Sequence, residues 1–234
     1  MSDQLRIFVA GGTGAVGRRL VPLLLAAGHH VTSSSRTPEG LARLRAQGVT
    51  AVPMDVYDAA AVDRAVAAAA PDVVVHQLTD LAYGDPAANG RIRREGTRNL
   101  VGAAKRAGVT RIVAQSLAFA YEPGDGPADE RTPLDATPGR RAAMRGSLRA
   151  LEEACAELPE YVILRYGEFY GPGTWYAPGG PVEALLRGRA TDAPAAAPAE
   201  GREGWQRGAD NALARSRGWR PLHPSWRTGF TADR

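Results

Sequence analysis

The sequence predicts an α/β domain built on a doubly wound, Rossmann-type parallel sheet, followed by a short C-terminal appendage. A short apolar run at residues 7–10 leads into glycines at positions 11, 14 and 17 and then into an apolar-periodic helix. Strand-like runs then alternate with helical patterns as far as residue 165, which is typical of βαβ units with right-handed crossovers. The continuously apolar run Val73–Val75 indicates a strand that is covered on both faces.

The pattern assigns each element in turn. Glycines at positions 28, 48 and 108 mark helix ends, and Asp58 is a candidate N-cap. Strands are expected at residues 5–10, 30–34, 50–53, 72–76, 110–116 and 161–165, and helices at 15–27, 38–46, 58–69, 87–107 and 141–157.

The expected domain organisation has three parts. Residues 1–187 form the nucleotide-binding domain. Residues 188–208 are rich in alanine and proline and predict a linker. Residues 209–234 are expected to pack back on the domain, with a short helix at 209–217.

Composition narrows the class of protein. No run approaches the roughly 18 apolar residues of a membrane span, and the N-terminus has no leader pattern. Cys155 is the single cysteine, so we expect a cytoplasmic protein without disulfides. The net charge is +4, but Lys105 is the only lysine and the arginines are spread along the chain. We therefore expect neither nucleic acid nor membrane as a partner.

The glycines after the first predicted strand indicate a phosphate-binding turn. Gly11, Gly14 and Gly17 allow a tight turn, a close approach of the backbone to phosphates and close helix packing. The helix that follows offers free N–H groups and a positive dipole end to an anion. The segment therefore predicts a dinucleotide site, whose cofactor-binding residues are Gly11, Thr13, Gly14, Ala15, Val16 and Gly17.

The end of the second strand predicts the choice of cofactor. NAD sites place a carboxylate about 20 residues after the glycines, whereas NADP sites place an arginine nearby. Here Ser35 and Arg36 stand at that position, and no acid comes before Glu39. We therefore expect NADP, with NAD as the alternative. Arg36 could equally be one more exposed arginine.

Several motifs together resemble the extended short-chain dehydrogenase/reductases, also called the NAD-dependent epimerase/dehydratase family. They are Gly11-x-x-Gly14-x-x-Gly17, Met54-Asp55-Val56, Glu95-Gly-Thr-Arg-Asn-Leu100, Val113-Ala-Gln-Ser116 and Leu164-Arg-Tyr-Gly-Glu-Phe-Tyr170-Gly-Pro172. The resemblance implies that Asp55 and Val56 contact adenine and that Ser116 holds a substrate oxygen. Gln77 and Leu78, after the strand at 72–76, join the expected cofactor-binding residues.

Two features depart from that family. Its further strands after the sixth are replaced here by the alanine- and proline-rich stretch. Its Tyr-x-x-x-Lys acid/base pair, in which the ammonium lowers the tyrosine pKa, has no counterpart anywhere in the chain. If Glu152 is the family's helix glutamate, the pair falls on Met144 and Leu148. If Glu153 is, it falls on Arg145 and Arg149.

Other groups at the same sheet edge are candidates for the chemistry. Ser116 could hydrogen-bond a substrate oxygen. Tyr121, Tyr166 or Tyr170 could replace the missing acid, and His76 could act as a general acid or base. Packing is the alternative for each tyrosine, and a satisfied strand-end histidine for His76. The run Arg91–Arg94 could meet an anionic substrate or form a solvated face. No cluster has metal-ligand spacing, so no metal is expected.

The main hypothesis is an NADP-binding reductase, epimerase or dehydratase that acts on a small organic molecule with a non-standard proton donor and that could serve specialised biosynthesis. The alternatives are a redox-neutral cyclase or dehydratase that uses the nucleotide as a scaffold, and a non-catalytic NADP-binding regulator. Resemblance also suggests a homodimer. The apolar stripe Met144, Leu148, Leu151 and Cys155 fits either a core or such an interface.

Overall fold

A computed structural model of the chain describes residues 4–80, 85–139, 141–169, 174 and 209–221. The chain divides into two compact units. The first comprises residues 1–117 and 136–165, and the second comprises residues 118–135 and 166–234. The predicted linker at 188–208 and the boundary at residue 187 lie outside the described residues. Each unit is considered by itself below.

The first unit contains a six-stranded sheet with the strand order β3-β2-β1-β4-β5-β6. The register pairs Val9 of β1 with Ser33 of β2 on one side and with Val75 of β4 on the other, in parallel. This order is that of a Rossmann fold and confirms the predicted fold class. The strands are β1 (Arg6–Ala10), β2 (His30–Ser35), β3 (Thr50–Pro53), β4 (Val73–His76), β5 (Arg111–Leu117) and β6 (Glu160–Tyr166).

The helices follow the predicted alternation closely. Asp58 caps its helix by accepting a hydrogen bond from the amide of Ala61, at 3.0 Å. The first unit contains α1 (Gly17–Ala26), α2 (Pro38–Ala46), α3 (Ala59–Ala69), α4 (Pro86–Arg91), η1 (Ile92–Gly96), α5 (Thr97–Arg106) and α6 (Ala142–Cys155), and the second contains η2 (Ala118–Ala120) and α8 (Ala212–Ser216).

Two predicted helices need correction. The first begins at Gly17 rather than at residue 15, because residues 11–16 form turns above the strand. The helix expected at 87–107 is interrupted by η1, a π-helical turn in which the amide of Thr97 bonds back to the carbonyl of Ile92. A 3.6-residue apolar period does not reveal a single wide turn, so the sequence pattern missed this feature.

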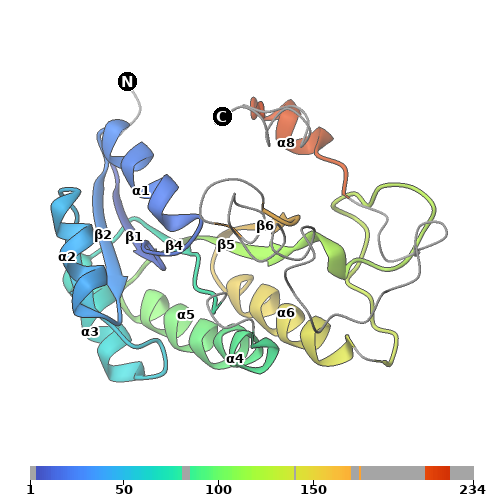
Figure 1. Cartoon of the computed structure of the whole chain (residues 1–234), viewed down its shortest axis with the longest axis horizontal. Helices are drawn as coiled ribbons and strands as arrows, with labels where there is room; N and C mark the ends of the chain where they lie inside the picture. The colour runs from blue at the N-terminus through green and yellow to red at the C-terminus, as the bar shows by residue number, and fades with distance from the viewer. Residues whose placement is uncertain (1–3, 81–84, 140, 170–173, 175–208, 222–234) are drawn as a thin grey trace, which may run out of the picture. The chain divides into compact units, whose positions relative to one another are not determined.

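Helices cover both faces of the sheet (Figure 1). Alternate residues of the strands contribute to two apolar cores, one on each face. Phe8 and Val74 pack against α3, α5 and α6. Val9 and Val75 pack with Val21 of α1, in the core that also contains a residue of α2. Leu151 and Cys155 of the stripe on α6 belong to the first core. Leu148 is buried as well, and all three are at most 2% exposed. These three side chains are therefore committed to the interior of this chain.

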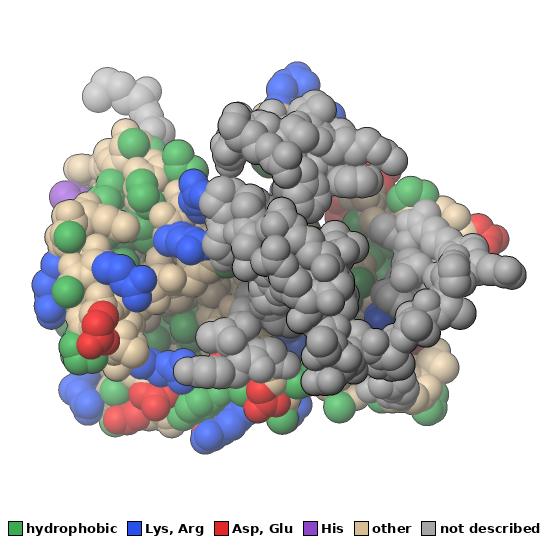
Figure 2. Space-filling model, viewed as in Figure 1, with side chains coloured by type: hydrophobic (Ala, Val, Ile, Leu, Met, Phe, Trp, Pro, Cys, Tyr) green, Lys and Arg blue, Asp and Glu red, His purple; other side chains and the backbone are tan. Residues whose placement is uncertain are grey.

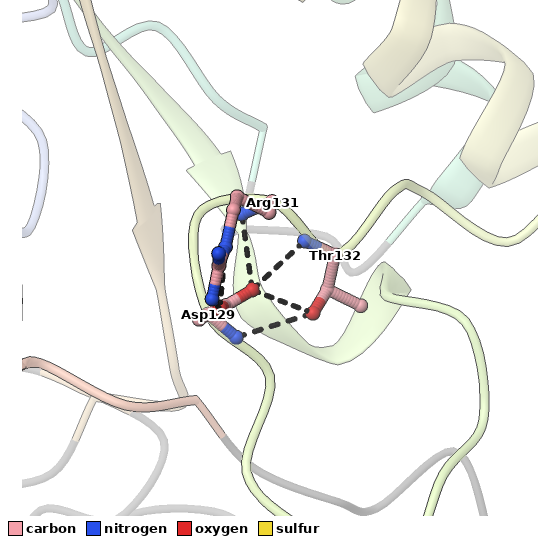
Figure 3. Close-up of polar contacts among 3 residues, drawn as sticks. All are labelled: Asp129, Arg131 and Thr132. Carbon is pink, nitrogen blue, oxygen red and sulfur yellow. Dashed lines mark hydrogen bonds and ion pairs between the residues drawn. The ribbon is translucent and has the colours of Figure 1, made fainter.

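In the second unit, backbone hydrogen bonds join the two ends of the loop at residues 120–135. The amide of Glu122 donates to the carbonyl of Pro133, and the amide of Asp135 donates to the carbonyl of Ala120. Figure 3 shows Asp129 between Arg131 and Thr132: its carboxylate accepts from the guanidinium of Arg131 and from the amide and hydroxyl of Thr132. These bonds lower the pKa of Asp129.

Basic and acidic side chains are interspersed along the lower edge of the face in Figure 2. Exposed ion pairs among the described residues include Arg98 and Lys105 with Glu157, and Arg106 with Asp63. Among the described residues, no helix is long and apolar enough to cross a membrane, and no group of histidine, cysteine or carboxylate side chains could hold a metal ion.

Candidate dinucleotide-binding and active site

The carboxyl ends of β1 and β4 lie at the point where the strand order reverses, which is the position at which such sheets bind ligands. The amide of Gln77 donates to the carbonyl of Ala10 at 2.8 Å and so joins the two strand ends. Gly11, directly after β1, has a φ of +98°, and a Cβ there would lie 2.6 Å from the carbonyl oxygen of Gln77. Only glycine fits this turn.

Close packing also requires glycine at position 17 and leaves little room at position 14. A Cβ at Gly17 would lie 2.2 Å from the carbonyl oxygen of Gly11 and 2.5 Å from Cα of Gly12. A Cβ at Gly14 would lie 3.3 Å from the same Gly11 oxygen, and Gly14 donates its amide to that oxygen at 3.1 Å. The backbone of the segment is therefore closely packed at the N-terminus of α1. Thr13, Ala15 and Val16 lie half-buried on this segment.

A buried polar atom directly after β4 gives a second indication of a ligand site. Gln77 is 4% exposed, and its side-chain oxygen Oε1 has no hydrogen-bond partner among the described residues. Leu78 beside it is half-buried. An unsatisfied buried oxygen next to a glycine cradle is consistent with a polar ligand that completes the site. The residues present therefore fit a dinucleotide.

The loop after β3 forms the expected adenine side. Asp55 accepts a hydrogen bond from the amide of Tyr57 at 3.0 Å. Asn99 donates its side-chain amide to the carbonyl of Val56 at 2.9 Å. A Cβ at Gly96 would lie 2.9 Å from Val56, so the glycine lets the helix approach this loop. The motif at residues 95–100 therefore holds the Asp55–Val56 loop in place, a role that the sequence analysis missed.

Arg36 lies exposed directly after β2, and Ser35 before it is buried. The hydroxyl of Ser35 accepts a hydrogen bond from the amide of Thr37 at 3.3 Å, which fixes the strand end. Burial raises the pKa of Tyr57, and the positive charges of Arg91 and Arg36 oppose that rise, so Arg36 is close enough to act on the adenine-side loop.

Ser116 is 2% exposed at the end of β5, where its hydroxyl donates to Oε1 of Glu152 at 2.6 Å. Arg165 of β6 donates to both oxygens of that carboxylate, at 3.0 and 2.7 Å. Three elements thus converge on one partly buried carboxylate. Because its hydrogen is given to Glu152, the Ser116 hydroxyl presents only an acceptor to any further group in this arrangement.

His76 is fully enclosed at the end of β4. The amide of Leu78 donates to Nδ1 at 3.3 Å, so the ring proton lies on Nε2, which is 2.8 Å from the hydroxyl of Thr97. Burial, assisted by the positive charge of Arg93, lowers the pKa of His76 to about 4. His76 is therefore neutral at pH 7 and fits the description of a satisfied strand-end histidine rather than that of a general acid.

The candidate tyrosines belong to the second unit. Tyr121 is 6% exposed and pairs with Leu134 through an antiparallel bridge. Tyr166 packs its ring at a centroid distance of 5.1 Å from Phe169. Tyr170 lies outside the described residues. These contacts fit the packing alternative for Tyr121 and Tyr166, and a proton-donor role for each of the three stays a prediction.

Comparison with known proteins identifies the family. A family model described as NAD(P)H-binding matches residues 11–184. The chain belongs to this NAD(P)H-binding family. The match begins at the first motif glycine and covers both the cradle and the sheet edge described above.

Individual relatives agree with the resemblance drawn from the motifs. The chain is 44% identical over 201 residues to a 3-diazoavenalumate denitrifying reductase from a Streptomyces species, which covers 79% of this chain and 63% of that protein. A UDP-glucose 4-epimerase from Thermus thermophilus, in complex with NAD, is 26% identical, with a TM-score of 0.60 over 72% of this chain and 57% of that one. The Bordetella bronchiseptica enzyme WbmG, in complex with NAD and UDP, is 25% identical, with a TM-score of 0.62 over 79% and 59%.

These matches confirm the predicted relation to epimerase- and reductase-type proteins that bind NAD(P). The chain spans less than two thirds of the length of each of these three proteins. Whether NADP or NAD is bound is left open by the family match, which covers both.

Within this NAD(P)H-binding family member, the structure decides the register of α6. Glu152 faces inward to Ser116 and Arg165, whereas Glu153 is exposed. If the inward-facing Glu152 is the family's helix glutamate, the positions of the missing acid/base pair are Met144 and Leu148. Leu148 is fully buried and Met144 half-buried, so apolar side chains stand where a proton donor and its ammonium partner would be.

The pKa of His76 leads to a prediction about stability. Between pH 6.5 and 4 the unfolded chain binds a proton at this histidine while the folded chain does not, so the free energy of unfolding falls as the pH falls. The full effect is about 3 kcal/mol, present above pH 6.5 and lost by pH 4.

Urea unfolding at a series of pH values checks this expectation. His76→Gln keeps a donor toward Thr97 but does not titrate, so the variant should lose less stability than the parent over this range. His30→Gln, at an exposed histidine, is the control and should follow the parent curve. Parallel curves for His76→Gln and the parent would contradict the assignment.

Proposed function

We propose that the chain is an NADP-dependent reductase that removes a diazo group from a small organic substrate as dinitrogen. The observation that carries this proposal is the replacement of the acid/base pair by Met144 and Leu148 beside an intact dinucleotide cradle. The 44% identical relative, named as a denitrifying reductase of a diazo compound, supports it.

The chemistry explains why an acid/base pair is dispensable. Reduction of a carbonyl creates an alkoxide, which needs a proton from a placed donor. Reduction of an arenediazonium carbon does not: the carbon gains one hydride, the C–N bond breaks and neutral dinitrogen leaves, so charge and atoms balance without a proton. The bound reduced nicotinamide would supply that hydride.

The chain's own residues would bind and orient the reactants. The segment Gly11–Gly17 would hold the pyrophosphate, and Gln77 and the Asp55–Val56 loop would complete the nucleotide site. Met144, which is half-buried on α6, would give the substrate an apolar, water-poor wall. Exclusion of water favours hydride transfer because water would otherwise compete for the reactive carbon.

The test is to mix the chain with NADPH deuterated at the transferable position and with a diazotised aminobenzoate, and to follow NADPH absorbance, dinitrogen release and deuterium in the product. We expect equal amounts of NADPH consumed and dinitrogen formed, faster than in a protein-free control. The matching formylbenzoate, whose carbonyl needs a proton donor, should not be reduced. Product formed without NADPH consumption would instead favour the redox-neutral alternative, and reduction of the aldehyde alone would refute the proposal.

The proposed preference for NADP rests on Arg36, which is exposed after β2 and acts on the adenine-side loop. A guanidinium pairs well with a 2′-phosphate. Arg36→Ala should weaken NADPH binding by about tenfold to a hundredfold and leave NADH binding within about twofold. Fluorescence titration with both nucleotides checks this expectation. The control is Arg43→Ala, at an exposed arginine of α2. Equal losses for both nucleotides would contradict it.

A further inference from the structure

The arginine run at positions 91–94 splits into three different environments. Arg91 pairs with Glu95 at 2.6 Å and lies over the ring of Tyr57, 3.9 Å from its centroid. Arg94 is exposed and lies along Gly90, where an added Cβ would be 3.2 Å from its guanidinium. Arg93 differs from both, because it is drawn into the interface between η1 and α6.

Arg93 is a partly buried cation without a carboxylate partner among the described residues. Its Nη1 approaches the hydroxyl of Ser147 on α6, at 3.5 Å. That hydroxyl already donates to the carbonyl of Met144 at 2.7 Å, so it offers Arg93 only a long, neutral contact. Burial lowers the pKa of Arg93, and a guanidinium nevertheless stays charged at neutral pH. A charge withheld from water in this way is stabilised when an anion arrives.

Arg93 lies near the helix position at which the family has its catalytic lysine and this chain has Leu148. Ser147 directly precedes Leu148, the residue that stands where the family's lysine would be. The hydroxyl of Thr97, whose amide closes η1, lies 2.8 Å from Nε2 of His76 at the end of β4, so the turn that carries Arg93 lies at the carboxyl edge of the sheet. Arg93 thus brings a positive charge from η1 to the residue next to Leu148, and its guanidinium binds anions but does not exchange protons.

We propose that Arg93 is a substrate-binding residue that pairs with a carboxylate group of the substrate. The planar guanidinium can donate two parallel hydrogen bonds to a carboxylate. A single arginine is therefore better matched to one carboxylate than to a group of phosphates. The nucleotide phosphates have their own cradle after β1. The inference deepens the proposed function, because it names the acidic class of diazo substrate that this site would accept.

The test uses equilibrium binding, so that it does not depend on turnover. The NADP⁺-saturated chain is titrated calorimetrically with propionate, benzoate and cinnamate, each beside its neutral amide. We expect at least one acid to bind more tightly than its amide. Arg93→Gln should weaken that binding about tenfold to a hundredfold without changing the affinity for the amide or for NADP⁺. Arg93→Lys should restore part of it, because the charge returns without the planar fork.

Arg94→Gln, on the same turn but exposed, is the matched control and should bind the acids as the parent does. Three outcomes would overturn the inference: no preference of the parent for any acid over its amide, an equal loss of acid and amide binding in Arg93→Gln, or the same loss in Arg94→Gln. A preference for the acids that depends on Arg93, in a chain that never consumes NADPH, would uphold this inference while refuting the proposed reductase.

Discussion

Gly17→Ala should strongly weaken dinucleotide binding and destabilise the fold. The new Cβ would lie 2.2 Å from the carbonyl oxygen of Gly11 and 2.5 Å from Cα of Gly12. Both obstacles are backbone atoms, so no side chain can rotate away, and the turn over α1 must move. We expect a loss of about 3 kcal/mol in the free energy of unfolding and a loss of NADPH affinity of about a hundredfold or more.

Gly146→Ala on α6 is the matched control for that substitution. A Cβ there would meet no atom within 4 Å, and the backbone is helical. Alanine has the higher helix propensity, so this variant should gain about 0.5–1 kcal/mol. Urea unfolding and fluorescence titration with NADPH measure both quantities. If Gly17→Ala bound NADPH as tightly as the parent does, the glycine segment could not be the pyrophosphate site that the structure indicates.

Glu152→Gln should produce the second large effect, because this carboxylate joins β5, β6 and α6. The side chains of Arg165 and Glu152 are only 19% and 15% exposed. Removing the charge of Glu152 leaves the Arg165 guanidinium without that ion pair and weakens the bond from Ser116. Breaking a buried pair costs about 3–5 kcal/mol, and the residual exposure lowers the expected loss here to about 2 kcal/mol.

Two further variants separate the ion pair from its neighbours. Ser116→Ala removes one hydrogen bond and should cost about 1 kcal/mol. Glu153→Gln changes the adjacent exposed carboxylate and should stay within about 0.5 kcal/mol of the parent. If Glu152→Gln were as stable as Glu153→Gln, packing alone would hold β5, β6 and α6 together at this point.

Much of the fold could be predicted from local patterns in the sequence. The helix at 38–46 and the strand at 50–53 have the predicted bounds, and Gly28, Gly48 and Gly108 all have positive φ values at helix ends. These features depend on a few neighbouring residues: an apolar period, a cap or a backbone conformation that favours glycine. Local chemistry decides them whatever the rest of the chain does.

The candidate site was only partly readable in this way. The sequence located the glycine segment that would bind the nucleotide, because places where two stretches of backbone come close together favour glycine. It did not choose between Glu152 and Glu153, because two adjacent helical residues differ only in the face they present, and packing against β5 and β6 makes that choice. Nor did it distinguish Arg93 from Arg91 and Arg94 in the same run.

By itself, then, the sequence determined that this chain forms a doubly wound sheet with a dinucleotide turn and lacks the family's Tyr-x-x-x-Lys pair. The tertiary structure alone decided that His76 is enclosed and neutral, that Ser116 is bonded to Glu152 and that Arg93 is withdrawn from water. The reason is physical: residue identity fixes which protons and charges are available, whereas burial and partners fix which of them can act.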